Sequence, residues 1–215
     1  MDKADRRWGV IILTHGRADR VITYSTLRKE GYTGPIYLLC DDEDEDLAKY
    51  KETFADKVIV FNKEEWIGKS DAFYNESPSG TPLYARNAAS YITKHQLGWT
   101  HFIMMDDDYY HTYLKWNEFD KSSGCHKMRC KEATDLDALF DICFDLLDDT
   151  HADVIGLAQG GDMIGGARGS GGLNLVKRKV MNVFFIATDR CPTFRGFMNE
   201  DVNLYVEPSN NHFMF

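Results

Sequence analysis

Hydrophobic and polar positions alternate along the first hundred residues in blocks that are typical of buried strands and amphipathic helices in turn. The predicted strands are short apolar runs, at residues 9–14, 35–40, 57–61 and 101–105. The predicted helices lie between them, at residues 19–29, 44–55 and 84–96. A polar loop at residues 68–82 precedes the last of these helices. Alternating strands and helices predict a parallel sheet.

The second half of the chain is less regular. An apolar stripe from Leu136 to Leu147 predicts a helix, and Thr134 with Asp137 resembles a capping box at its start. Residues 154–158 and 179–188 predict two more strands. Eight of the 17 residues from 156 to 172 are glycine, which predicts a mobile loop. We therefore expect one α/β domain, a mostly parallel Rossmann-like sheet flanked by helices.

Composition agrees with one globular domain. The chain has 215 residues, of which 43% are hydrophobic, and its longest apolar runs fall far short of the roughly 20 residues that span a bilayer. The charged N-terminus resembles no apolar leader, so we expect a cytoplasmic protein. The five cysteines include no C-x-x-C pair and predict reduced thiols. Cys125, His126 and Cys130, with His111, fit no common zinc finger.

The net charge of −9 does not exclude a polyanionic partner, because the acids are unevenly distributed. Residues 41–46 hold six acids and residues 132–153 hold eight, with no Lys or Arg in either stretch. The remaining chain has 25 bases against 34 − 14 = 20 acids, a net charge of +5. Such a partner is therefore permitted, although the total charge does not indicate one.

The most informative residues are Asp106, Asp107 and Asp108, which directly follow a predicted buried strand. Ligands of open α/β sheets bind at the carboxyl ends of the strands. Three adjacent carboxylates there would repel one another unless a cation neutralised them, and Mg²⁺ or Mn²⁺ prefers oxygen ligands. A metal that bridges a diphosphate is the natural occupant. The simpler alternative is an acidic turn on a solvated surface.

Other predicted strand ends suit a nucleotide. The first strand runs into Thr14, His15, Gly16 and Arg17, which could cradle a base or a phosphate. Asp41, after the second strand, could accept hydrogen bonds from a base or ribose, or could merely begin an acidic helix cap. Arg86, near the start of a predicted helix, could bind phosphate with both arms of its guanidinium, or could be a surface arginine. The expected nucleotide-sugar-binding set is Thr14, His15, Arg17, Asp41, Arg86, Asp106 and Asp107.

Taken in order along the chain, these features resemble the GT-A glycosyltransferases, which are metal-dependent nucleotide-sugar enzymes. The shared features are the Ala-Arg-Asn stretch at residues 85–87, the D-x-D formed by Asp106 and Asp108, and the downstream pair Glu200 and Asp201. The resemblance covers about residues 8–205. It implies a nucleotide-binding half at about residues 8–108 and an acceptor half at about residues 109–215.

A narrower resemblance is to the small phage-type glycosyltransferases associated with TET/JBP dioxygenases. It is carried by the apolar strand and T-H-G-R turn at residues 11–17, Y-A-R-N at 84–87, M-M-D-D-D-Y at 104–109 and N-E-D-V-N at 199–203. Those enzymes are thought to glycosylate hydroxymethylated pyrimidines in DNA. The resemblance implies hydroxymethylcytosine or hydroxymethyluracil in phage DNA, inside the host cytoplasm, as the acceptor.

The resemblance also implies a mechanism. The donor is a nucleoside-diphosphate sugar such as a UDP-sugar, and the metal ligands for Mn²⁺ or Mg²⁺ are Asp106 and Asp108. Asp201, or Glu200 beside it, is the expected catalytic base, although the pair could instead be acids at a helix N-terminus. A further ligand is often a histidine beyond this pair, where only His212 is available. Its place three residues before the last one suggests an abbreviated C-terminal half or a shortened chain.

A DNA acceptor would use the residues that follow the three aspartates. Aromatic side chains could line an acceptor pocket for a flipped base, although most such side chains are core: Tyr109, Tyr110, Tyr113 and Trp116. Basic side chains could contact the DNA backbone: Lys121, Lys127, Arg129, Lys131 and residues 177–179. A glycosyltransferase acting on glycan or protein, a nucleotidyltransferase, a metal-dependent nuclease and a non-catalytic nucleotide-binding module are the alternatives.

Overall fold

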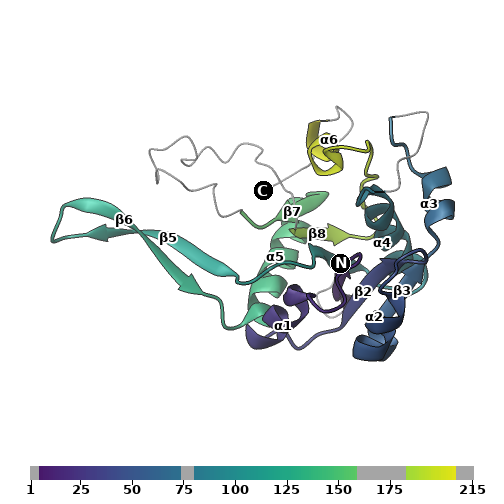
Figure 1. Ribbon diagram of the computed structural model, residues 1–215. Coiled ribbons are helices and arrows are strands. Elements are labelled where there is room, and N and C mark those ends of the chain that lie inside the picture. Colours follow the sequence, from purple (N-terminus) through teal and green to yellow (C-terminus); the bar gives the residue numbers. More distant parts are fainter. Residues whose placement is uncertain (1–4, 74–79, 159–182, 207–215) are drawn as a thin grey trace.

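The protein forms a six-stranded sheet with helices on both faces, as the computed structural model shows for residues 5–73, 80–158 and 183–206 (Figure 1). In sheet order the strands are β3 (Val58–Phe61), β2 (Ile36–Asp41), β1 (Val10–Leu13), β4 (His101–Asp106), β8 (Val183–Ala187) and β7 (Val154–Gly156). The first four are mutually parallel, and β8 runs antiparallel to both β4 and β7. The predicted α/β class with a mostly parallel sheet is confirmed.

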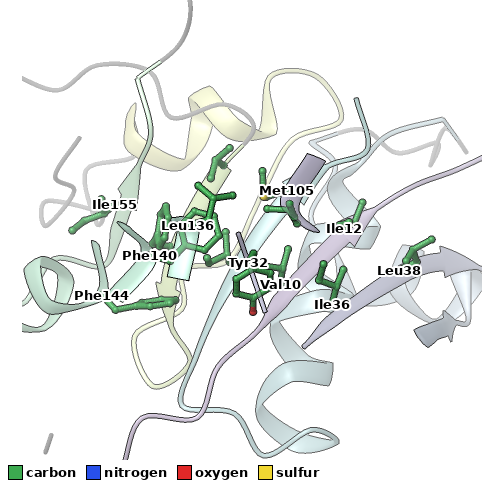
Figure 2. Close-up of a cluster of buried hydrophobic side chains, with 14 of the residues drawn as sticks. Val10, Ile12, Tyr32, Ile36, Leu38, Met105, Leu136, Phe140, Phe144 and Ile155 are labelled. Atoms are coloured by element: carbon green, nitrogen blue, oxygen red, sulfur yellow. The ribbon is translucent and has the colours of Figure 1, made fainter. Parts of the chain in front are cut away.

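Both faces of the sheet are buried, which is why the central strands are apolar except at their ends, such as His101 and Asp106 of β4. One face packs against α1 (Ile22–Lys29), α2 (Leu47–Phe54) and α5 (Leu136–Thr150). Figure 2 shows this core, where Val10 and Ile12 of β1 lie near Met105 of β4 and the rings of α5. The other face packs against α3 (Lys63–Lys69), α4 (Leu83–His95) and α6 (Glu200–Val206).

The predicted helix after residue 134 exists, but its cap is a different residue. The side chain of Asp135 accepts a hydrogen bond from the backbone N–H of Ala138 at 3.1 Å, and α5 begins at Leu136. Thr134 therefore precedes the cap, and the predicted capping box is wrong by one residue. The sequence pattern did not predict the short helix α3, which overlaps the start of the predicted loop at residues 68–82.

A cluster of charged side chains fixes the start of β4 to α5. Arg6 contacts Asp145 and Asp148 at 3.1 and 2.8 Å, and Asp148 also lies 3.0 Å from Nε2 of His101. His101 is fully buried, and burial lowers its pKa although Asp148 acts in the opposite direction. The imidazole is therefore neutral at pH 7.

Residues 113–132 form an antiparallel two-stranded ribbon that the sequence pattern did not predict. Strands β5 (Tyr113–Asp120) and β6 (Cys125–Glu132) pair along their whole length, and the ribbon projects away from the rest of the protein in Figure 1. Cys125 pairs with Asp120 and Cys130 with Lys115. Because cross-strand partners share a face and faces alternate along a strand, the two cysteines lie on opposite faces.

Several sequence predictions fall on residues outside those that the structure describes. They are the metal ligand His212, most of the glycine-rich segment, the basic residues 177–179 and the first four residues of the predicted strand 179–188. Within the described part of the chain, every helix is too short or too polar to cross a lipid bilayer.

Candidate active site

The central strands β1 and β4 end beside each other at the point where the order of the sheet reverses. From β1 the chain first adds β2 and β3 on one side and then β4 on the other. Such a switch point opens a crevice at the carboxyl ends of the strands, where ligands of α/β proteins bind. Leu13 lies opposite Asp106 in the ladder, which brings residues 14–17 next to the three aspartates.

A cavity of about 440 Å³ opens at this switch point. Its lining includes six of the seven residues expected to bind the nucleotide-sugar, together with the expected metal ligand Asp108: Thr14, His15, Arg17, Asp41, Asp106, Asp107 and Asp108. Lys63, Thr81 and Tyr84 also line it. The volume lies within the range of small-ligand sites, about 300–1,000 Å³. The structure thus gathers residues from three strand ends into one cavity.

The three aspartates have different surroundings. Asp107 is 4% exposed, and it accepts hydrogen bonds from the Thr14 hydroxyl at 2.7 Å and from Arg17 Nη1 at 2.9 Å. Asp108 is exposed and has no hydrogen bond or ion pair within the described part of the chain. The middle aspartate therefore fixes the loop after β1, while Asp108 is free to bind a ligand.

Asp106 lies in a place where negative charge is only partly compensated. Burial raises its pKa to about 6, the guanidinium of Arg86 opposes this, and the carboxylates of Asp108, Asp107 and Glu200 add to it. Its side chain nevertheless keeps 30% of its surface exposed, toward the cavity that it lines. Carboxylate oxygens that line one cavity and repel one another form a donor set that fits a hard divalent cation.

Asp41 is held from two sides at the other end of the cavity. His15 Nδ1 lies 2.8 Å from its Oδ2, and Lys63 Nζ lies 3.6 Å from its Oδ1. The Lys63 side chain is only 9% exposed and also lies 3.3 Å from Glu43. The sequence analysis did not name Lys63 as a site residue. It lies two residues after β3, so it is at a strand end like the other residues that line the cavity. The Asp41 carboxylate and the Lys63 ammonium could bind complementary groups of a base or ribose.

Tyr50 of α2 supports the loop that follows β1. Its buried hydroxyl lies 2.8 Å from the Thr14 hydroxyl and accepts a hydrogen bond from the backbone N–H of Arg17 at 2.8 Å. Burial raises the pKa of Tyr50 to about 12, so the hydroxyl stays protonated. The loop is therefore fixed at several points before any ligand binds.

Arg86 has a different environment from the phosphate contact that we predicted. Its side chain is 3% exposed, its Nε donates to Glu200 at 3.0 Å, and its Nη2 lies 3.5 Å from Asp106. The guanidinium lies over the rings of Phe184 and Phe194, at 4.9 and 5.7 Å from their centroids. Arg86 does not line the cavity. It connects β4 to α6 inside the protein, so it is not a surface arginine, and its expected contact with phosphate stays a prediction.

Glu200 and Asp201 form the first turn of α6, as the alternative of a helix N-terminus anticipated. They are 6% and 7% exposed. The Glu200 carboxylate is held by Arg86, whereas Oδ1 of Asp201 accepts the neighbouring backbone N–H of Val202 at 2.8 Å. Neither residue lines the cavity described above, and their predicted role as catalytic base stays a prediction.

A second cavity, of about 680 Å³, lies on the other side of Asp108. Tyr109, Tyr110 and Tyr113 line it, together with Leu139 and Val183. Trp116 does not line it and lies on the exposed ribbon. Because Asp108 lines both cavities, molecules bound in the two cavities would meet at this residue.

Comparison with known proteins identifies relatives. A sequence model of the family described as TET-Associated Glycosyltransferase matches residues 8–215. No curated protein matches significantly. Among solved structures, S. aureus TarS residues 1–349 is 14% identical (TM-score 0.48) and covers 97% of this chain. The galactosyltransferase LgtC, solved with donor and acceptor sugar analogs, is 12% identical (TM-score 0.44) and covers 85%. The chain spans 57% and 58% of those two solved chains.

Proposed function

Because the chain belongs to the TET-associated glycosyltransferase family, we propose that it transfers a sugar from a nucleoside-diphosphate sugar to an acceptor hydroxyl, with Mn²⁺ or Mg²⁺ as cofactor. The observation that carries this proposal is the pair of cavities that meet at Asp108. One lies at the switch point of the sheet and is lined by several charged side chains, and the other is lined by tyrosines. A transferase needs two such sites, because its two substrates must react at their common boundary.

The donor occupies the cavity at the ends of β1 and β4. Asp41, held by His15 and Lys63, accepts hydrogen bonds from the base or ribose. Thr14 and Arg17 lie beside Asp107, closer to the diphosphate. The Arg17 side chain is half exposed, so its guanidinium can contact a phosphate and remain near Asp107.

Asp106 and Asp108 are the proposed metal ligands. A bound divalent cation would neutralise the diphosphate leaving group, so that no protonated acid is needed for its departure. Arg86 holds Asp106 from inside the protein and restricts the directions in which its carboxylate can point. Asp107 is the proposed anchor of the loop after β1 rather than a ligand of the cation.

Asp201 is the proposed general base. It would take the proton from the acceptor hydroxyl while the hydroxyl oxygen attacks the anomeric carbon and the bond to the diphosphate oxygen breaks. A positioned base contributes on the order of 100- to 10,000-fold. Glu200 is less suited to this role, because Arg86 holds its carboxylate as an ion pair. A single displacement of this kind inverts the anomeric configuration.

The acceptor is a hydroxymethylated pyrimidine in DNA. Tyr109, Tyr110 and Tyr113 provide apolar faces in the second cavity on which a base turned out of the helix can stack. The main alternative is a hydroxyl of a glycan or protein, which the same tyrosines could bind. A nucleotidyltransferase is the second alternative, and it would release pyrophosphate rather than a nucleoside diphosphate.

The test combines donor binding with product analysis. A panel of nucleotide-sugars is titrated with and without Mn²⁺, and Asp108→Ala is compared with Asp149→Ala, which removes an exposed aspartate from α5. We expect metal-dependent donor binding that Asp108→Ala weakens at least tenfold and Asp149→Ala leaves unchanged. DNA with hydroxymethylcytosine or hydroxymethyluracil should then gain the mass of one sugar. A gain on glycan or protein alone would refute the DNA acceptor, and metal-independent donor turnover would refute the proposed site.

A further inference from the structure

The β5–β6 ribbon exposes a kind of surface that folded proteins usually cover. Five large apolar side chains on it keep between 37% and 54% of their surface exposed: Tyr113, Leu114, Trp116, Phe119 and Met128. The register places Leu114 and Trp116 on one face and the other three on the opposite face. An isolated two-stranded ribbon is marginally stable, and contiguous apolar exposure marks an interaction site.

The ribbon is basic although the chain is acidic. Residues 113–132 contain five Lys or Arg and three acids, a net charge of +2, so the rest of the chain carries −9 − 2 = −11. Each acid is paired: Glu118 with Arg129, Asp120 with Lys127, and Glu132 with Lys29 and His111. Within the described residues, the remaining lysines of the ribbon, Lys115, Lys121 and Lys131, have no ion pair. The positive charge of the ribbon that no acid neutralises therefore lies on these three exposed lysines.

The base of the ribbon is anchored beside the second cavity. The backbone N–H of Thr112 donates to both carboxylate oxygens of the buried Glu30 at 3.1 Å, and His111 Nδ1 lies 2.9 Å from Glu132. Tyr113 and Leu114, the first residues of β5, line the cavity. These contacts place the base of the ribbon beside the proposed acceptor site. From its base, the ribbon extends away from the rest of the protein (Figure 1).

We infer that the β5–β6 ribbon binds double-stranded DNA alongside the base that is modified; this rests on the proposed function. A strand of eight residues extends about 26 Å at about 3.3 Å per residue. That length equals the rise of about eight base pairs along the axis of a DNA duplex, at about 3.4 Å each. The major groove is wide enough to admit a two-stranded ribbon. Lysines contact phosphates, while Trp116, on the same face as Lys131, contacts the groove or an unstacked base.

The experiment measures binding of an unmodified fluorescent duplex of about 25 base pairs by anisotropy, without donor or metal, from about 50 to 200 mM salt. Lys121→Gln/Lys131→Gln is the test variant. Lys51→Gln/Lys94→Gln removes two exposed lysines from α2 and α4 and is the matched control. Two lost phosphate contacts make the log–log salt slope shallower by about 1.8 in the test variant only. Trp116→Ser weakens binding by about fivefold or more without changing the slope.

A second readout separates this inference from the proposed function. Metal-dependent hydrolysis of the donor, with water as acceptor, should be equal in wild type and in all of these variants. If the donor is hydrolysed but the duplex does not bind, or both lysine pairs change the slope equally, the ribbon is not a DNA-binding element. If the ribbon variants alter only the sedimentation of the chain, the ribbon joins two copies and the inference is also refuted. If the donor does not bind at all, the proposed function itself fails.

Discussion

The buried ion pair between Arg86 and Glu200 makes a quantitative prediction about how β4 is attached to α6. Arg86 is 3% exposed and Glu200 is 6% exposed, so neither charge can be hydrated when its partner is removed. Arg86→Met fills the space between Phe184 and Phe194 with an apolar side chain but leaves the Glu200 carboxylate buried without its cation. Breaking a buried pair in this way costs about 3–5 kcal/mol.

A double-mutant cycle distinguishes this cost from lost packing. Glu200→Gln removes the second charge with almost no change in shape, so Arg86→Met/Glu200→Gln leaves no unpaired charge at Glu200. Asp106 also loses a cation 3.5 Å away, but its side chain is 30% exposed and remains partly hydrated. We therefore expect the double variant to be less destabilised than the sum of the two single variants by at least about 1.5 kcal/mol.

Urea unfolding followed by the fluorescence of the four tryptophans measures these differences. In thermal unfolding, Arg86→Met should lower Tm by about 6–20 °C, at about 2–4 °C per kcal/mol for a chain of this size. Arg86→Lys keeps the charge without the planar fork and should be intermediate. Additive single-variant effects, within about 0.5 kcal/mol, would show that Arg86 and Glu200 are not coupled and would refute this reasoning.

Three further predictions concern the cavity and the core. Asp107→Asn should lower the free energy of unfolding by about 1.5–3 kcal/mol, because it weakens the hydrogen bonds to Thr14 and Arg17 in the loop after β1. Asp108→Asn should leave Tm unchanged and abolish Mn²⁺-dependent donor binding. Thermal unfolding measures the first effect, and titration of the donor with and without Mn²⁺ measures the second. Lys63→Met should raise the KM for the donor about tenfold with little change in kcat, since Lys63 and Asp41 lie away from the reacting atoms; steady-state kinetics check this. Because the pKa of His101 is lowered in the folded state, the unfolded chain takes up a proton at a higher pH, and the stability of the wild type should fall as the pH decreases below about 6.5. His101→Gln should make the urea midpoint less dependent on pH between pH 5 and about 6.5. The same pH dependence in both proteins would refute a neutral buried imidazole.

The central sheet could be predicted because its burial determines its sequence. Strands covered on both faces are apolar at their interior positions, so β1, β2 and β4 appear as short apolar runs with helices between them. The β5–β6 ribbon gives no such signal, because neither of its faces is buried and its apolar residues lie on both. A sequence pattern that reflects burial cannot predict an element whose residues are all exposed or half-buried.

The sequence could predict which residues share a cavity where strand position alone decides it. Thr14, Asp41 and Asp108 follow strands, and the sheet brings strand ends together whatever the side chains are. The buried position of Arg86 was not predicted, because its residue type was considered without its helix face. It lies three residues after Leu83 and three before Ala89, both fully buried, and this spacing places it on the inner face of α4. The signal was present in the sequence.

The three consecutive aspartates show how one stretch of like charge serves two purposes. Asp106 is the last residue of β4, whereas Asp107 and Asp108 follow it in a turn; all three line the same cavity, but their partners differ. The register of Leu13 opposite Asp106 then places Thr14 next to Asp107, where a hydroxyl and Arg17 satisfy the buried carboxylate. Charge at position 107 is thus needed to hold the loop that surrounds the donor cavity, whereas charge at 108 has no partner of its own in the described protein. This asymmetry predicts that the two outer aspartates cannot be exchanged in role with the middle one, although all three are chemically identical.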